Sequence, residues 1–138
     1  MPKISAYFDH AAIAVTEPEK LKKVLLLLGL KDEGTEEVAT QGVLTHFIVP
    51  VEKSKGKVEI LEPTDPSGVI QKFLNKKGPG IHHLCFRVSD IEAASAILRK
   101  ESIRLVYESA QPGAHHTKVN FIHPESTGGV LIEISQGS

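Results

Sequence analysis

Alternating hydrophobic and polar positions predict strands along most of the chain, and amphipathic stretches between them predict helices. The predicted strands cover residues 7–15, 42–51, 57–63, 82–88, 103–109, 118–124 and 129–136. The predicted helices cover residues 16–29, 66–78 and 89–102. Strands and helices that interleave in this way indicate an α+β fold.

Local signals predict where the first helix begins and ends. Thr16 is suited to be the N-cap, and Glu19 follows three residues later as in a capping box. Pro18 fits the first turn, and Gly29 is a typical stop. We therefore expect a helix whose first turn is capped by the Thr16 side chain.

The order of elements repeats about half-way along the chain. His10 lies 73 residues before His83, and Glu59 lies 74 residues before Glu133. A repeat of this length predicts two copies of one supersecondary unit, each roughly βαβββ. One copy alone, of ~60–70 residues, would have a marginal core. The two copies are therefore expected to pair.

This pairing predicts one domain over residues 1–138. The repeats are expected at about residues 5–66 and 78–136. The expected architecture is a pair of βαβββ modules that form a cupped mixed sheet around a metal-binding cleft.

Glu133 stands in the apolar run "VLIEIS", which predicts a buried strand. An unpaired buried carboxylate costs several kcal/mol or more, so it is usually neutralised, paired or bound to a cation. Alternate residues of a strand point to opposite faces. The face of the predicted strands that is opposite the helices carries four polar residues: His10, Glu59, His83 and Glu133.

Two imidazoles and two carboxylates that meet in a cleft make a site for a divalent metal ion. Nitrogen and hard oxygen ligands suit cobalt, nickel, manganese, iron or zinc, and the absence of a thiolate argues against a purely structural zinc site. Four protein ligands of an octahedral ion leave about two positions for water or substrate oxygens. In this interpretation the ion holds the charge of Glu133.

Other residues of metal-binding or nucleophilic type have simpler interpretations. Cys85 shares the parity of His83 and is interpreted as a small apolar filler. The remaining histidines are interpreted as structural or exposed: His46, His82, His115, His116 and His123. An alternative in which the loop that holds His115 and His116 lines the site stays open.

Composition narrows the class of protein. The 138 residues are 41% hydrophobic and 24% charged, with a net charge of −1, so no whole-molecule field favours nucleic acid or an anionic membrane. Cys85 is the single cysteine, which excludes an intrachain disulfide and fits a reducing compartment. The apolar run "VLLLL" is far too short to span a bilayer. The expected location is the cytoplasm.

At these residues the sequence resembles the vicinal oxygen chelate superfamily and, within it, the methylmalonyl-CoA epimerase family. The blocks "DHAAIAV", "KVEILEP", "GIHHLCFRVSDIEAA" and "FIHPESTGGVLIEISQ" resemble that family's blocks in the same order, over essentially the whole chain. The resemblance implies a homodimer, methylmalonyl-CoA as the substrate, and a divalent ion with cobalt foremost. It assigns the metal to His10, Glu59, His83 and Glu133.

The activity that the resemblance implies is interconversion of the two C2 epimers of methylmalonyl-CoA. Loss of the C2 proton builds negative charge on the thioester oxygen, which a metal ion stabilises. Glu133 and Glu59 are the expected acid/base residues, with Glu133 first. Some family members carry a further glutamate at the position that aligns with Thr45, and threonine cannot replace it as a carboxylate. Either Glu59 or a metal-bound water then serves, or the reaction is a different one.

Two other classes of function compete with this hypothesis. One is a lactoylglutathione lyase, or another isomerase or lyase of the superfamily, which uses the same chemistry on another substrate. Ring-cleaving dioxygenases share the fold but usually keep two histidines and one carboxylate. The other class is a metal-free small-molecule-binding protein, which does not need four ligands.

Overall fold

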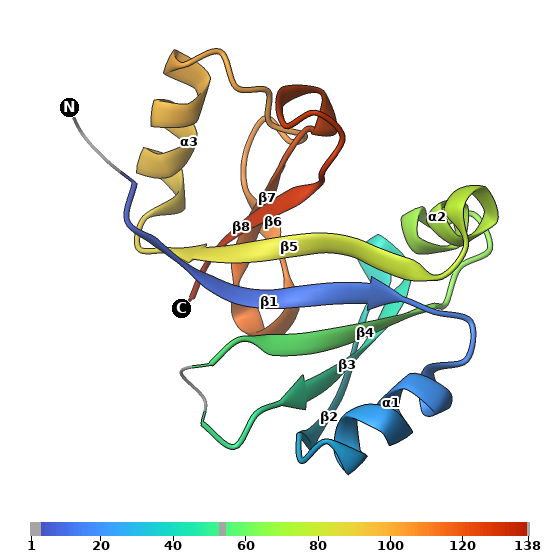
Figure 1. Cartoon of the computed structure of the whole chain (residues 1–138). Helices are drawn as coiled ribbons and strands as arrows, with labels where there is room; N and C mark the ends of the chain where they lie inside the picture. Colours follow the sequence, from blue (N-terminus) through green and yellow to red (C-terminus); the bar gives the residue numbers. More distant parts are fainter. Residues whose placement is uncertain (1–3, 53–54, 138) are drawn as a thin grey trace. The chain divides into compact units, whose positions relative to one another are not determined.

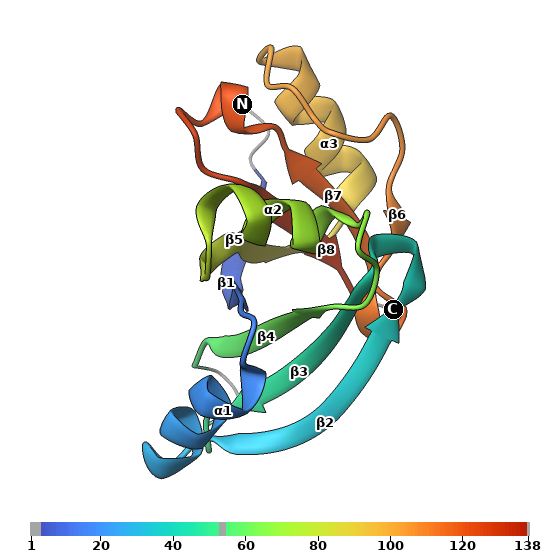
Figure 2. The same cartoon turned by 90° about the vertical axis from the view of Figure 1, so that its right-hand side faces the viewer.

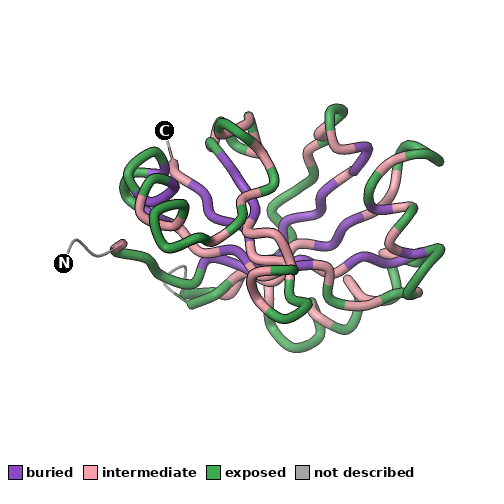
Figure 3. Tube along the Cα trace, turned by 90° about the horizontal axis from the view of Figure 1, so that it is seen from above, coloured by how far each residue is buried: buried purple, intermediate pink, exposed green. Residues whose placement is uncertain are grey.

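The computed structural model describes residues 4–52 and 55–137. The chain divides into two compact units. We call His10–His82 the N-terminal unit, and His83–Ser138 together with Met1–Asp9 the C-terminal unit. Among the described residues, no helix has the length and apolar composition needed to cross a membrane. Buried residues lie mainly in the strands (Figure 3).

The N-terminal unit forms a sheet with the strand order β2-β3-β4-β1 (Figure 1). The parallel pair is β1 with β4, and the other two pairs are antiparallel. Its elements are β1 (Ala6–Ala14, which belongs to this unit from His10), α1 (Pro18–Leu27), β2 (Lys31–Val38), β3 (Val43–Val49), β4 (Lys57–Pro63) and α2 (Val69–Lys77).

The predicted cap of α1 is wrong by one residue. The N-cap is Glu17, whose side chain makes no capping hydrogen bond, and Pro18 is the first helical residue. Proline favours the first helical position because its missing N–H needs no partner there. That preference makes the residue before Pro18 the cap and leaves Thr16 outside the helix.

The strand β2 is missing from the sequence-based prediction. Its sequence, "KDEGTEEV", has one strongly apolar residue, and most of its side chains are exposed. Within its unit β2 pairs with β3 alone, so its outer edge has no partner strand there. An edge strand of this kind keeps a polar, charged sequence that does not alternate. Figure 2 shows β2 and β3 as a long curved hairpin.

Two clusters of apolar side chains cover the two faces of the N-terminal sheet. On one face, which we call the α1 face, Ile48 and Ile60 are fully buried against Leu21 and Leu25 of α1. The other face carries His10 and Glu59, and we call it the site face. This face is also partly covered, because α2 packs on Ala12, Ala14, Val43 and Leu61. The expectation of a helix-free face is therefore wrong at the α2 end.

The C-terminal unit forms a sheet with the strand order β5-β8-β7-β6. The strands β5 and β8 are parallel, and the other pairs are antiparallel. Its elements are β5 (Gly80–Val88, which belongs to this unit from His83), α3 (Ile91–Lys100), β6 (Gln111–Pro112), β7 (Lys118–Ile122) and β8 (Ile132–Gln136). Asp90 caps α3 by accepting a hydrogen bond from the Ala93 N–H.

The predicted strand at 103–109 is wrong. In that segment only Leu105 forms a bridge, to Ile122. The buried side chain of Asn120 satisfies the backbone instead: its Oδ1 accepts from the Tyr107 N–H, and its Nδ2 donates to the Tyr107 carbonyl. An amide side chain can offer both a donor and an acceptor, so it replaces a strand partner here.

Candidate metal centre

In the N-terminal unit, strand pairing brings His10 and Glu59 together. The parallel register of β1 and β4 pairs Ala12 with Glu59 and Lys57 with His10. The His10 Nδ1 lies 3.2 Å from the Glu59 Oε2, and the two side chains are 7% and 14% exposed. His10 and Glu59 thus form a titratable pair on the site face with little exposure to solvent.

In the C-terminal unit, the same arrangement joins His83 and Glu133. The parallel register of β5 and β8 pairs Cys85 with Glu133. The His83 Nε2 lies 2.9 Å from the Glu133 Oε1, and the side chains are 8% and 12% exposed. The rings of His83 and Phe121 pack in a T-shaped arrangement, with ring centroids 5.5 Å apart.

The two pairs have the same place in their sheets. In each unit the glutamate pairs with the residue that lies two positions after the histidine, Ala12 in one and Cys85 in the other. Residues i and i+2 of a strand share a face, so each histidine and its glutamate lie on the same face. The two histidine–glutamate pairs therefore have equivalent places in the strand register of their units.

The donor atoms of both pairs fit a divalent cation. A buried carboxylate needs a hydrogen-bond donor or a positive charge, and in each unit the imidazole nitrogen meets this need. The same nitrogen and oxygen atoms are the ones that bind first-row metals in proteins. The chemistry of the donor atoms in each pair therefore suits a divalent cation.

Two of the remaining histidines make structural contacts. On the α1 face, the His46 Nε2 lies 3.0 Å from the Glu62 Oε1. The His82 ring packs edge-on against Phe73, with centroids 4.9 Å apart. These positions agree with the structural interpretation of both residues.

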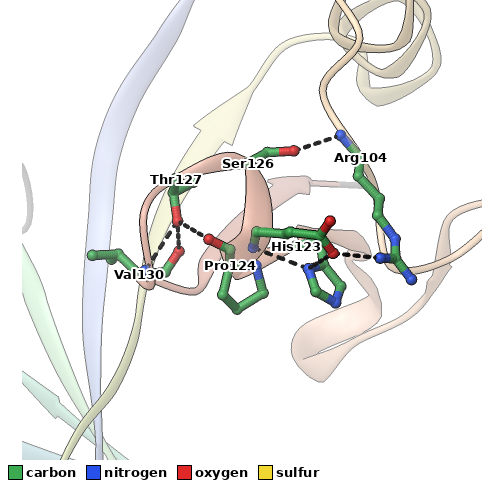
Figure 4. A network of polar contacts seen from close by, with 7 residues as sticks. Arg104, His123, Pro124, Ser126, Thr127 and Val130 are labelled. Carbon is green, nitrogen blue, oxygen red and sulfur yellow. Dashed lines mark hydrogen bonds and ion pairs between the residues drawn. The ribbon is translucent and has the colours of Figure 1, made fainter.

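His123 stabilises the turn that precedes β8. Its Nδ1 accepts a hydrogen bond from the Glu125 N–H at 3.0 Å, and Glu125 pairs with Arg104 at 2.7 Å (Figure 4). The Ser126 hydroxyl accepts from the Arg104 N–H, and Thr127 bonds to the backbone of Val130 (Figure 4). The His123 side chain bonds within the turn, and Arg104 ties the turn to the segment that follows α3, so the side chain of His123 has a structural role.

His115 and His116 are exposed, as expected, but their backbone is unusual. Their φ angles are 55° and 59°, in the left-handed region that non-glycine residues seldom adopt. Cys85 is fully buried, and its thiol donates to the Ser135 hydroxyl at 3.4 Å. The interpretation of Cys85 as a filler agrees with this burial.

Sequence reasoning did not single out Asp9 as a buried charged residue, although its side chain is only 8% exposed. In the C-terminal unit its Oδ1 lies 3.7 Å from the Arg87 Nη2, and the Arg87 Nε donates to Ser135 at 3.0 Å. The signal was available: Asp9 is an acidic residue inside a predicted strand, the same anomaly that drew attention to Glu133.

Comparisons with known proteins agree with this geometry. Residues 9–121 match the model of the Glyoxalase/Bleomycin resistance protein/Dioxygenase superfamily. The mitochondrial methylmalonyl-CoA epimerase of Homo sapiens is 37% identical over 130 residues, which cover 93% of this chain and 72% of that protein.

Two solved structures extend the similarity to the fold. The methylmalonyl-CoA epimerase of Mycobacterium tuberculosis has a TM-score of 0.89 and 37% identity, covering 95% of this chain and 87% of that chain. A Streptomyces coelicolor methylmalonyl-CoA epimerase variant in complex with 2-nitronate-propionyl-CoA has a TM-score of 0.87 and 26% identity, covering 99% of both chains. The predicted α+β class with paired βαβββ modules is confirmed. The chain belongs to the Glyoxalase/Bleomycin resistance protein/Dioxygenase superfamily and, within it, to the methylmalonyl-CoA epimerase family.

Proposed function

We propose that the chain is an isomerase that interconverts the C2 epimers of methylmalonyl-CoA with the help of a divalent metal ion. Membership of the epimerase family carries this conclusion. A solved family member holds a propionyl-CoA nitronate, which supports an acyl-CoA substrate for this chain. The two buried histidine–glutamate pairs provide the chemistry.

The proposed ligands of the ion are His10, Glu59, His83 and Glu133. Each pair supplies two of the four donors that the family resemblance assigns to one ion. When bound, the ion stabilises negative charge that develops on the substrate oxygens. Cobalt is our first candidate, and manganese, nickel, iron or zinc would also suit these donors.

Glu133 is the proposed proton acceptor for one face of C2. The C2–H bond breaks, its electron pair moves toward the thioester oxygen, and the proton passes to a carboxylate oxygen of Glu133. The His83 Nε2 lies 2.9 Å from the Glu133 Oε1, so these two proposed ligands are held side by side before the ion binds. Glu59, held by His10 in the same way, is the matching candidate for the other proton transfer.

A homodimer and a cytoplasmic location complete the proposal. Both rest on the sequence, the dimer on the family resemblance and the location on composition. Light scattering of the purified chain at micromolar concentration tests the dimer: a mass of two chains is expected, and a single-chain mass at all concentrations would contradict it.

Proton NMR in deuterium oxide with methylmalonyl-CoA tests the activity. We expect the C2 proton signal to disappear when metal-loaded protein is added, and to persist when a chelator has removed the metal. If metal-loaded protein exchanges no C2 proton, the substrate is a different one. In that case methylglyoxal with glutathione, the substrate of a lactoylglutathione lyase, is the next compound to assay.

A further inference from the structure

Inversion at C2 needs a proton carrier on each face of the planar intermediate. If Glu133 takes the proton from one face and returns it to that face, the starting epimer is formed again. Inversion requires a donor on the opposite face. We propose that Glu36, on the edge strand β2, is this second acid/base residue. The assignment rests on the proposed function and replaces Glu59 in this role.

Strand register puts Glu36 on the site face. The central strand β3 pairs Thr45 with Glu36 on one side and with Leu61 on the other. One pleat further along, Phe47 pairs with Glu59. Paired residues share a face, and so do residues two apart on a strand. Glu36, Thr45 and Glu59 therefore project from the same face of this sheet.

Burial agrees with the register. Along β2 the residues from Lys31 to Thr35 are exposed, and so is Glu37, whereas Glu36 and Val38 are half-buried. Val38 packs on the apolar cluster of the site face, which fixes the direction of its neighbour two positions earlier. Glu36 is thus an acidic side chain that points inward on an otherwise exposed strand.

The other acidic residues of β2 are less suited to this role. Glu37 pairs with Leu44 and Asp32 pairs with Ile48, which both lie on the α1 face. Glu33 lies in the irregular part of the register and is exposed.

The small size of Thr45 allows the Glu36 side chain, on the outer strand β2, to extend toward the substrate. Thr45 is 3% exposed and stands between Glu36 and Leu61 in the same row. Directly paired Cβ atoms lie about 4.5–5.5 Å apart, so the longer Glu36 side chain can extend over the small threonine. At the position where some family members carry glutamate, this chain has the small Thr45, which leaves room for the Glu36 side chain.

The proposed step balances without a further reactant. Glu133 as a carboxylate takes the C2 proton, and the C–H electron pair forms the C1–C2 double bond of the enolate. Glu36 as a carboxylic acid then gives its proton to the opposite face of C2, and the electron pair returns to form the new C–H bond. Glu133 ends protonated and Glu36 ionised, and exchange of protons with water resets both.

The test separates two readouts from one stereochemically pure epimer in deuterium oxide. In Glu36→Gln we expect interconversion to fall by about 10²–10⁴-fold, the usual effect of losing a general acid or base. Deuterium incorporation into the epimer whose proton Glu133 removes should stay near the wild-type rate. The neighbour on the opposite face supplies a matched control, because Glu37→Gln should change neither readout. The double variant Glu36→Gln/Thr45→Glu moves the carboxylate one strand inward and should restore part of the interconversion.

Three results would overturn the assignment. Wild-type interconversion by Glu36→Gln would exclude Glu36 as the acid/base. Equal loss of both readouts in a variant that keeps its melting temperature and its metal would show a positioning role instead. A wild type that exchanges no C2 proton would overturn the proposed function, and the assignment with it, whereas the first two results leave that function intact.

Discussion

The two units build the same histidine–glutamate contact from different amounts of regular structure. In the N-terminal unit, β4 is followed outward by β3 and the eight-residue β2. In the C-terminal unit, β8 is followed by β7 and then by β6, which has two residues. Hydrogen bonds from the side chain of Asn120 satisfy part of the backbone there. The parallel strand pair, not the outer strands, therefore makes the contact.

This difference means that the outer strands can take separate tasks. The N-terminal unit keeps a complete outer strand and places Glu36 on it. In the C-terminal unit the outer strand is reduced to β6, and the loop from β6 to β7 contains His115 and His116, both with positive φ. Substitutions that act on one unit alone can test how far the equivalence of the two pairs extends.

The largest effect is expected when a histidine is removed from either pair. His83→Ala and His10→Ala should each lose the metal and the activity, because one imidazole and the direction of its glutamate are lost together. His46→Ala is the matched control, since His46 contacts Glu62 on the α1 face and should leave metal content unchanged. Elemental analysis with an activity assay measures both. Full metal occupancy in His10→Ala/His83→Ala would exclude the proposed ligands.

The next largest effect is expected to distinguish Glu133 from Glu59 by the turnover of their glutamine variants. Glu133→Gln should lower turnover by about 10²–10⁴-fold, because an amide cannot accept the C2 proton. Metal should be partly retained, because an amide oxygen still binds an ion. Glu59→Gln should be much milder if Glu59 is a ligand alone. Steady-state kinetics on metal-loaded protein measures this difference, and near wild-type turnover by Glu133→Gln would exclude it as the essential base.

A smaller effect, on stability, is expected from the side chain that replaces the missing strand. Asn120 is fully buried, and its Oδ1 also accepts from the Phe121 N–H at 2.8 Å. Asn120→Ala removes the hydrogen bonds of the part-buried Tyr107 N–H and C=O and of the buried Phe121 N–H, at a cost of about 1–3 kcal/mol in unfolding free energy. Asn75→Ala, which removes an exposed hydrogen bond to Gln71, is the control. Urea denaturation compares the two, and equal midpoints would contradict the role of Asn120.

Sequence reasoning succeeded where alternation and burial agree. The parity of β4 and β8 is clear because apolar residues flank Glu59 and Glu133. In β5, Leu84, Phe86 and Val88 set the parity of His83. The repeat was found for the same reason, since both halves carry this pattern. Membership of the epimerase family followed from the same blocks.

Sequence reasoning failed where a sheet edge or a side-chain hydrogen bond determines the local backbone structure. A strand at the edge of its sheet can be polar, so β2 and the inward position of Glu36 left no periodic signal. The apolar segment 103–109 has the composition of a strand, but it forms a single bridge, and the Asn120 side chain bonds to Tyr107 there, which no local pattern reveals. The cover of the site face by α2 depends on packing between distant segments. These features are tertiary, and one sequence does not encode them locally.

The smallest effect concerns α2 of the N-terminal unit. Asp65 holds the turn before it: the Ser67 N–H and hydroxyl both donate to the Asp65 Oδ1, at 3.0 and 2.9 Å. The backbone hydrogen bond from Ser67 lowers the pKa of Asp65 below the usual value of 3.8 for this side chain.

A folded-state pKa that is lowered means a contribution to stability that is present above 3.8 and is lost as the pH falls through the folded value. Asp65→Asn should therefore lower the melting temperature slightly at neutral pH, and the difference from wild type should shrink below pH 3.8. The carboxylate is exposed, so the change should stay small. Melting curves from pH 7 to pH 2.5 follow it. A difference that grows as the pH falls would contradict the assigned direction, and with it the place of the Asp65 turn in holding α2 on the site face.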